Sequence, residues 1–148
     1  MKSTLSGINH FAFRHHRTPS QNDFFVALRP KTNQEPENAE KDIHDDDLIC
    51  RQCRFAITNE TNRITVNGAH CHTFANPHGI VFEIGCFNKA DGCAVMGHPT
   101  SEFSWFPPNL WQTAICGFCL SHLGWRFSTS GNVIFWGLIL DRLIQADL

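Results

Sequence analysis

The chain has 148 residues, of which 42% are hydrophobic and 18% are charged, and its formal net charge is −2. This length suits one domain with a hydrophobic core plus a tail, and the scattered Lys and Arg residues form no basic stripe of the kind that nucleic-acid grooves need. No apolar run is long enough to span a membrane, and residues 1–17 contain no apolar signal core. We therefore expect a cytoplasmic protein that binds neither nucleic acid polymers nor membranes.

Residues 1–47 are predicted to form a polar, largely disordered tail. The stretch 31–47 is rich in Asn, Gln, Glu, Asp and Lys, and it ends in three consecutive aspartates. Such a composition cannot bury enough apolar surface to fold alone. Residues 24–28 are the one apolar patch of this region and could dock on the domain as an added strand. The folded domain is expected over residues 48–148.

The first β signals lie in residues 63–87. The segments 63–66 and 69–74 flank Asn67-Gly68, and these two residue types accept the positive φ angles of a tight type I′ hairpin turn. A second turn is expected at 76–79. The Val-, Ile- and Phe-rich segment 80–87 is then expected to form a strand.

The second half of the chain continues the β pattern. Gly97-His98-Pro99 is expected to break the chain, and the segments 111–116, 125–129 and 133–140 are predicted strands, the last two joined by a turn at 130–132. Residues 138–144 could be a strand that continues into a short helix, because periodicity does not decide between the two. The sequence thus predicts a mainly β domain of antiparallel strands.

Two Cys-x-x-Cys motifs, Cys50/Cys53 and Cys116/Cys119, stand 62 residues apart. Four thiolates in two close pairs are typical of one tetrahedral metal site, and Zn²⁺ is the ion that such sites hold most often. The alternatives are unligated thiols or a redox pair, but two such motifs arise together by chance far less often than one. Because a closed four-sulfur shell leaves no position for water, we expect one structural Zn²⁺ that clasps two distant loops.

Three tryptophans, Trp105, Trp111 and Trp125, bracket the second cysteine motif. Composition alone fits a packed core as well as a binding cage, since Trp is highly buried on average. The pair Pro107-Pro108 stiffens a loop and Gly124 permits close approach of the backbone, and both features favour rigid walls around a ligand. Three indole faces can enclose either a cation or a flat neutral ring.

Several motifs occur together in one order along the chain. They are Cys50-Arg-Gln-Cys53, Asn76-Pro-His-Gly79, Glu102-Phe-Ser-Trp-Phe-Pro107, Trp111, Cys116-Gly-Phe-Cys119, Ser121-His-Leu-Gly-Trp-Arg-Phe127 and Phe135-Trp-Gly-Leu138. In this order they closely resemble the CULT family, the thalidomide-binding domains of cereblon, and most of all its stand-alone bacterial members. The resemblance covers about residues 48–144.

The resemblance implies a β-tent, in which a zinc ion with four cysteine ligands pins together two antiparallel sheets, roughly orthogonal to each other. It also implies an aromatic cage for glutarimide, thalidomide-like drugs and related cyclic imides. Trp105, Trp111 and Trp125 would be the walls and Phe127 the floor. The other ligand-binding residues that it implies are Asn76 beside the pocket, with Phe103, Ser104 and Trp105 on the loop whose backbone meets the imide edge. Phe103 stands where cereblon has a histidine, so only backbone contacts are expected there.

The leading functional prediction is a binding module without catalytic residues. Its natural ligand could be a protein C-terminus that ends in a cyclised Asn or Gln, or a uracil-like nucleoside, because both present an imide edge. One alternative is an enzyme similar to methionine sulfoxide reductase B, but that chemistry needs a nucleophilic cysteine beyond the second motif, and no Cys follows Cys119. Another is a methylammonium reader, for which Glu102 is the only acid near the tryptophans. A role as a ubiquitin-ligase receptor is not expected to carry over.

The remaining histidines and cysteines are predicted to be structural. His78 and His122 are expected to hold loops, because no nucleophile is paired with them in any motif. His70 and His72 alternate with Cys71, so they should share one face of a strand, and a solvent-facing side is the simpler expectation. Leftover thiols such as Cys71 are harmless in a reducing compartment, and small buried thiols are common.

Overall fold

The computed structural model describes residues 42–130 and 132–147, and the predictions for residues 1–41, including an added strand at 24–28, lie outside this range. The described residues form nine strands and two short 3₁₀ turns, Glu60–Asn62 and Leu140–Arg142. They contain no helix with the length and hydropathy that a membrane crossing requires.

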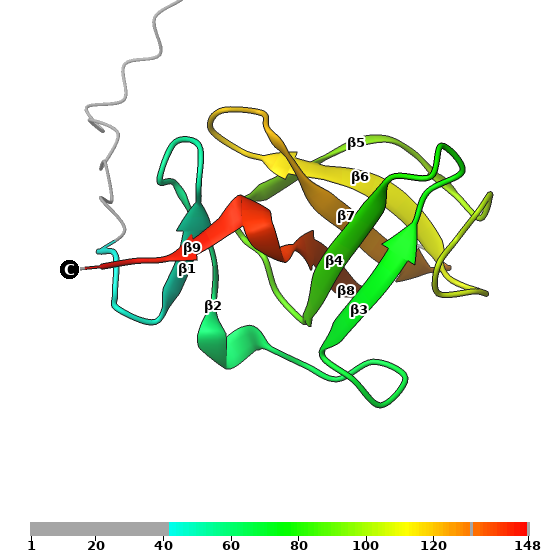
Figure 1. Ribbon diagram of the computed structural model, residues 1–148, viewed down its shortest axis with the longest axis horizontal. Helices are drawn as coiled ribbons and strands as arrows, with labels where there is room; N and C mark the ends of the chain where they lie inside the picture. The colour runs from blue at the N-terminus through cyan, green and yellow to red at the C-terminus, as the bar shows by residue number, and fades with distance from the viewer. Residues whose placement is uncertain (1–41, 131, 148) are drawn as a thin grey trace, which may run out of the picture. The chain divides into compact units, whose positions relative to one another are not determined.

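The strands divide into two antiparallel sheets (Figure 1). The small sheet has the order β2-β1-β9, with bounds β1 Asp47–Cys50, β2 Ala56–Asn59 and β9 Leu143–Gln145. The large sheet has the order β3-β4-β8-β7-β6-β5, with bounds β3 Cys71–Ala75, β4 Val81–Phe87, β5 Cys93–Thr100, β6 Leu110–Cys116, β7 His122–Thr129 and β8 Asn132–Ile139. The predicted fold class of two antiparallel sheets is confirmed.

The two faces of the large sheet carry separate cores. Phe87 and Leu138 pack in one buried cluster with Leu48, Ile57 and Leu143, so this cluster joins the large sheet to the small one. On the opposite face, Ile84 of β4 and Phe135 of β8 form a second cluster with Phe127 of β7 and with Phe106 from the loop between β5 and β6. Period-two alternation along each strand therefore builds an inter-sheet core on one face and an aromatic cluster on the other.

The turn at Asn67-Gly68 has the backbone that the sequence predicts. Both residues have positive φ, 49° and 84°, and Val66 and Ala69 pair across the turn. The flanking segment 63–66 differs from the prediction, because it forms only isolated bridges and no strand. The expected hairpin is thus a tight turn that leads into β3.

The predicted break at Gly97-His98-Pro99 is wrong, because these residues lie inside β5. The register with β6 shifts between Met96 and Thr100, so the segment bulges away from its neighbour. Gly97 has a φ of 78°, and its carbonyl accepts a 2.8 Å hydrogen bond from the Gln112 side chain. A glycine and a proline in a strand mark a bulge as well as they mark a turn.

The solvent-facing expectation for His70 and His72 is also wrong. His70 meets the ring of Phe87 edge-on at 5.1 Å, and His72 meets Phe106 at 5.1 Å. Both histidines are half-buried, whereas Cys71 between them is exposed. The alternation was predicted correctly, but the inward and outward faces are exchanged.

Gly124 lies where the backbones of β7 and β8 approach closely. A Cβ there would lie 2.1 Å from the Gly137 carbonyl oxygen, and the residue has a φ of 148°. We expect Gly124→Ala to destabilise the domain by about 3 kcal/mol or more, because backbone atoms would have to move. Gly79→Ala is the matched control, since it also has positive φ but open space around its Cβ. It should cost only about 1 kcal/mol in thermal denaturation.

Asp47 ties the start of the domain to both neighbouring strands. It is 8% exposed. Its carboxylate accepts hydrogen bonds from the His44 N–H and the Asn59 amide, both at 3.0 Å, and its carbonyl accepts one from the Ala146 N–H.

We expect a chain that begins at Lys41 to keep its stability and ligand binding. A chain that begins at Leu48 should lose about 1–3 kcal/mol in urea unfolding. Equal stability of the two chains would contradict this role for Asp47.

Candidate functional site

The two Cys-x-x-Cys motifs form turns of the same geometry. The residue after each second cysteine donates its N–H to the carbonyl of the first, Arg54 to Cys50 at 2.7 Å and Leu120 to Cys116 at 3.0 Å. These two donors have left-handed backbones, with φ of 65° and 64°. Cys50 is the last residue of β1 and Cys116 is the last of β6, so each sheet contributes one motif at a strand end.

The four sulfurs of the two motifs lie within 4.8 Å of one another. The sulfurs of Cys50 and Cys119 are 3.7 Å apart, and those of Cys53 and Cys116 are 3.6 Å apart. Sulfurs that each lie about 2.3 Å from a central ion form a tetrahedron with edges of about 3.8 Å. The cluster therefore has the size that one ion needs, and the four cysteines are placed to bind a single metal ion.

Local contacts give these thiols different acidities. Ser121 hydrogen bonds to the Cys119 sulfur at 3.1 Å and lowers the pKa of Cys119 to about 6. Burial raises the pKa of Cys53 to about 12. Since a metal binds thiolates, its binding must displace the protons that remain, so metal affinity should fall as the pH falls.

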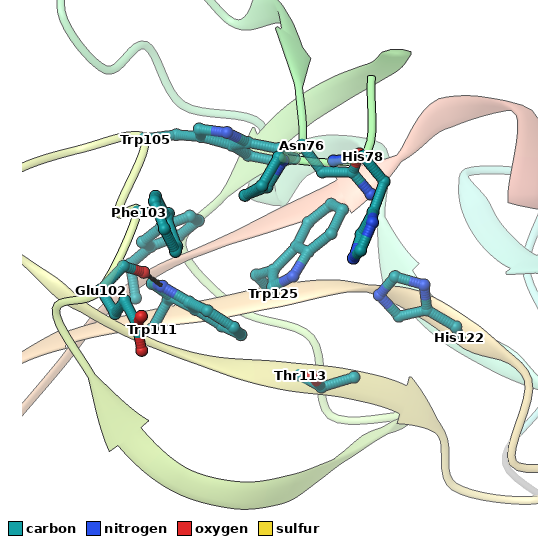
Figure 2. A pocket seen from close by; sticks show the side chains of 11 residues that line it. Asn76, His78, Glu102, Phe103, Trp105, Trp111, Thr113, His122 and Trp125 are labelled. Atoms are coloured by element: carbon teal, nitrogen blue, oxygen red, sulfur yellow. Dashed lines mark hydrogen bonds between the residues drawn. The ribbon is translucent and has the colours of Figure 1, made fainter. Parts of the chain in front are cut away.

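A separate cavity of about 610 Å³ lies beside the predicted tryptophans (Figure 2). Its lining comes from the turn after β3, from the loop between β5 and β6, and from strands β6 and β7. The lining residues are Asn76, Pro77, His78, Glu102, Phe103, Trp105, Trp111, Thr113, His122, Trp125 and Phe127. All the predicted ligand-binding residues except Ser104 are among them.

Trp111 and Trp125 reach this cavity from one face of the large sheet. Trp111 lies opposite Phe127 in the antiparallel register, and Trp125 lies opposite Thr113, so these four side chains share a face. Phe127 is 1% exposed and stacks on Phe135 with ring centroids 4.8 Å apart. The two indoles thus stand on a rigid sheet above a packed aromatic layer.

Trp105 comes from the loop between β5 and β6. Its ring stacks on Phe74 at 5.0 Å and meets the ring of Trp125 edge-on at 4.6 Å. Its indole N–H donates to the carbonyl at the end of β3 at 3.3 Å. From β6, Trp111 donates its indole N–H to the Glu102 carbonyl at 2.8 Å, drawn as a dashed line in Figure 2. The tryptophans therefore fix the loop as well as line the cavity.

The loop backbone next to these indoles has unused polar groups. Phe103 has a left-handed φ of 53°, and the residue is 67% exposed. Within the described part of the chain, neither Phe103 nor Trp105 uses its backbone N–H or C=O in a hydrogen bond. Ser104, between them, bonds its hydroxyl to the Asn109 carbonyl at 2.7 Å and does not line the cavity. The serine side chain shapes the loop, while the backbone groups of its neighbours are available to a ligand.

His78 and His122 also line the cavity, although their sequence context predicts only structural roles. In Figure 2 they lie on the side away from Phe103 and Glu102. His122 does have a structural bond, since its Nε2 contacts the Gly124 carbonyl at 3.1 Å. Burial lowers its pKa, so the ring is neutral at neutral pH.

A bulge explains why His122 was missed. Residues 122 and 125 are separated by an odd number and would face opposite sides of a regular strand. However, Ala114 of β6 pairs with Gly124 of β7, and the next β6 residue, Ile115, pairs with His122. One extra residue, Leu123, is therefore inserted into β7. This bulge turns His122 to the same side as Trp125, and their rings meet at 4.9 Å.

Asn76 lies in the turn between β3 and β4. Its side-chain oxygen accepts hydrogen bonds from the N–H groups of His78 at 3.0 Å and Ile80 at 2.9 Å. The oxygen therefore holds the turn, and the amide NH₂ of the same side chain makes no hydrogen bond with other described residues. This leaves the two N–H donors of one amide group at the rim of the cavity.

No protein-family model matches the chain. The chain is similar to several curated proteins, and the three relatives described next are each named protein cereblon. The chain is 35% identical to the one from Danio rerio over 104 residues, 33% identical to that from Gallus gallus over 111 residues, and 35% identical to that from Xenopus tropicalis over 103 residues. These matches cover 66%, 68% and 65% of the chain but only 24%, 25% and 23% of the relatives. The chain thus corresponds to about a quarter of each relative.

The matched part of the chain is a cereblon-like domain, as the ordered motifs predicted. It combines two antiparallel sheets, a four-cysteine cluster and a cavity lined by aromatic residues. The matches to cereblon together with these features support a cereblon-like binding module.

We expect purified protein to contain one Zn²⁺ per chain, and its removal to unfold the domain. A structural zinc site contributes on the order of 10 kcal/mol, comparable to the whole stability of a small domain. Elemental analysis measures the metal, and circular dichroism after chelation measures the fold. Cys116→Ser should lose both, whereas Cys71→Ser, an exposed thiol on β3, should keep both. A folded, zinc-free protein would contradict the prediction.

Proposed function

We propose that this cereblon-like domain is a non-enzymatic binding module that takes a neutral cyclic imide into its three-tryptophan cavity. We also propose that its four-cysteine cluster holds one structural Zn²⁺. The observation that carries the ligand proposal is the loop beside the cavity. Its residues Phe103 and Trp105 line the cavity and have backbone donors and acceptors without partners in the described chain.

The chemistry of an imide suits such a site. An imide places one N–H donor between two carbonyl acceptors, and the rest of a glutarimide ring is apolar CH₂. Backbone C=O and N–H groups of the loop can satisfy the polar edge, while indole faces cover the CH₂ groups. Trp105, Trp111 and Trp125 supply those faces, and the fully packed Phe127 prevents the cavity from collapsing further.

The lining offers no positive charge that would favour an anionic ligand. No Lys or Arg lines the cavity, and Glu102 is the one carboxylate residue in the lining. His122, whose pKa is lowered by burial, contributes no charge at neutral pH. A methylammonium cage commonly surrounds its cation with aromatic faces and gains from an acid, so Glu102 keeps this second candidate open to experiment.

The size of the cavity bears on the class of ligand. A volume of about 610 Å³ falls in the range of pockets that enclose drug-sized molecules, which are larger than a glutarimide ring. The imide could therefore be one end of a longer ligand. A peptide that ends in a cyclised Asn or Gln, a uridine-like nucleoside and a thalidomide-like drug all satisfy this description.

Reductase chemistry has less support from the lining. Its residues include no cysteine, so the thiolate nucleophile that sulfoxide reduction needs is missing from the cavity wall. The reactive side chains there are the Thr113 hydroxyl, the Glu102 carboxylate and the two histidines, and His122 already bonds to a backbone carbonyl. A binding function fits these groups better than catalysis.

Titration with glutarimide should change the tryptophan fluorescence, because three of the four tryptophans would contact the ligand. Trp111→Ala or Trp125→Ala should weaken binding by on the order of 2 kcal/mol, about 30-fold, as for buried aromatic anchors. Trp136→Phe is the control. It lies on β8 opposite Arg126, on the other face of the sheet, and should leave the affinity unchanged.

Two further ligands separate the candidate functions. N-methylglutarimide lacks the N–H donor and would leave a desolvated backbone acceptor without a partner, so we expect no measurable binding. Trimethyllysine should bind only if the site is a methylammonium cage. Equal affinity for glutarimide and its N-methyl analogue would refute recognition of the imide edge.

A further inference from the structure

We propose that Cys93 is a resolving thiol for the metal site. When a peroxide oxidises the cysteine cluster, Cys93 forms a cross-strand disulfide with Cys116, and the metal is released. The proposal uses a cysteine outside the four-sulfur cluster and is independent of the ligand cavity. It rests on the way in which β5 and β6 are paired.

Cys93 and Cys116 are direct partners across the two strands. Neither donates its N–H to the other, because Cys93 donates to the Ala90 carbonyl and Cys116 donates to the Ser121 carbonyl. They therefore form a non-hydrogen-bonded pair of an antiparallel ladder. In such pairs the Cα atoms are about 4.5 Å apart and the side chains lie on the same face. This separation falls at the short end of the range that disulfides span, about 4.4 to 6.8 Å.

The backbone around this pair is already fixed. Gly117 donates to the Gly92 carbonyl at 2.8 Å, and Gly92 donates to the Ile57 carbonyl at 3.0 Å. A Cβ on Gly92 would lie 2.0 Å from the Ala56 carbonyl oxygen, so the start of β5 is pressed against β2. Formation of the disulfide thus needs rotation of two side chains but no movement of the strands.

Burial also places the two sulfurs in one environment. Cys116 is fully buried in the inter-sheet core, and Cys93 packs against the same cluster. The other two leftover thiols belong elsewhere, since Cys71 is exposed on β3 and Cys86 is buried in the aromatic cluster. Among the cysteines of the described residues, Cys93 is the one outside the cluster that is paired with a cluster member.

The oxidation can be written as balanced steps. The sulfur of Cys119, which is only partly buried, attacks a peroxide oxygen; an S–O bond forms, the O–O bond breaks, and water or an alcohol leaves. The Cys116 sulfur then attacks the sulfenic sulfur, and hydroxide leaves with a thiol proton as water. Finally Cys93 attacks the Cys116 sulfur, and Cys119 leaves as a thiol. Overall two thiols lose two electrons and two protons, and the peroxide accepts both.

The Cys93–Cys116 disulfide would break the metal link between the two sheets. Cys116 can no longer ligate an ion, so Cys50, Cys53 and Cys119 hold an incomplete site. The new bond joins β5 to β6 inside the large sheet, whereas no disulfide or complete metal site then links the small sheet to it. A resolving thiol also protects the cluster, because a disulfide is reversible and sulfinic or sulfonic acids are not.

The test uses the full chain loaded with one equivalent of Zn²⁺ and treated with hydrogen peroxide. Cleavage after Phe87, after Glu102 and after Phe118 leaves Cys93, Cys116 and Cys119 each as the single cysteine of its own peptide. Mass spectrometry without reductant should find the Cys93 peptide joined to the Cys116 peptide, with one Zn²⁺ released per disulfide. Disulfides confined to the four cluster cysteines, with Cys93 recovered as a free thiol, would overturn the proposal without the need for any variant.

Recovery of the metal gives a second measurement. After peroxide, then reductant and Zn²⁺, the unmodified chain and the control Cys71→Ala should regain nearly all of their metal. Cys93→Ala should regain less than about half, because unresolved sulfenic acid proceeds to irreversible forms. Equal recovery in all three proteins would contradict a resolving role.

Discussion

The meeting of four sulfurs between two sheets is the constraint on which the rest of this domain depends. The motif at the end of β6 also begins the hairpin that β7 completes, and the two strands carry Trp111 and Trp125 on a shared face. One end of the hairpin is thus held by the cluster, while its middle forms a wall of the cavity. The cluster and the inter-sheet core are continuous, because Cys50 and Cys116 belong to both. A small domain commonly needs such a staple, because its core alone contributes little net stability.

The parts of the fold that are set by short-range chemistry could be predicted from the sequence. The paired cysteines predict both their turns and their ligand set, and Asn67-Gly68 predicts its positive φ angles. The errors arise where a local signal has two structural meanings. Glycine and proline at 97–99 indicate a break, but partner strand β6 continues past them and turns the break into a bulge. The alternation of His70 and His72 was visible, yet which side faces inward depends on aromatic rings from distant strands.

The cavity shows the same division between local and distant information. The motifs implied the tryptophans and Phe127, and the structure brings all of these residues to one lining. His122 could not be assigned to that lining by counting residues from Trp125, because the bulge in β7 reverses the parity of the strand. Bulges depend on which residues the partner strand offers, so a single strand read alone does not reveal them.

The two cysteine turns are alike in more than spacing. Each has a left-handed residue directly after its second cysteine and the same backbone hydrogen bond back to the first, although one belongs to the small sheet and the other to the large sheet. The two turns therefore present their cysteines to the cluster with the same local backbone geometry. Because each sheet contributes one equivalent cysteine turn, neither sheet carries the metal site alone. A change in ionic radius at the centre would be shared by both turns, so the sheets would separate symmetrically rather than one of them distorting alone.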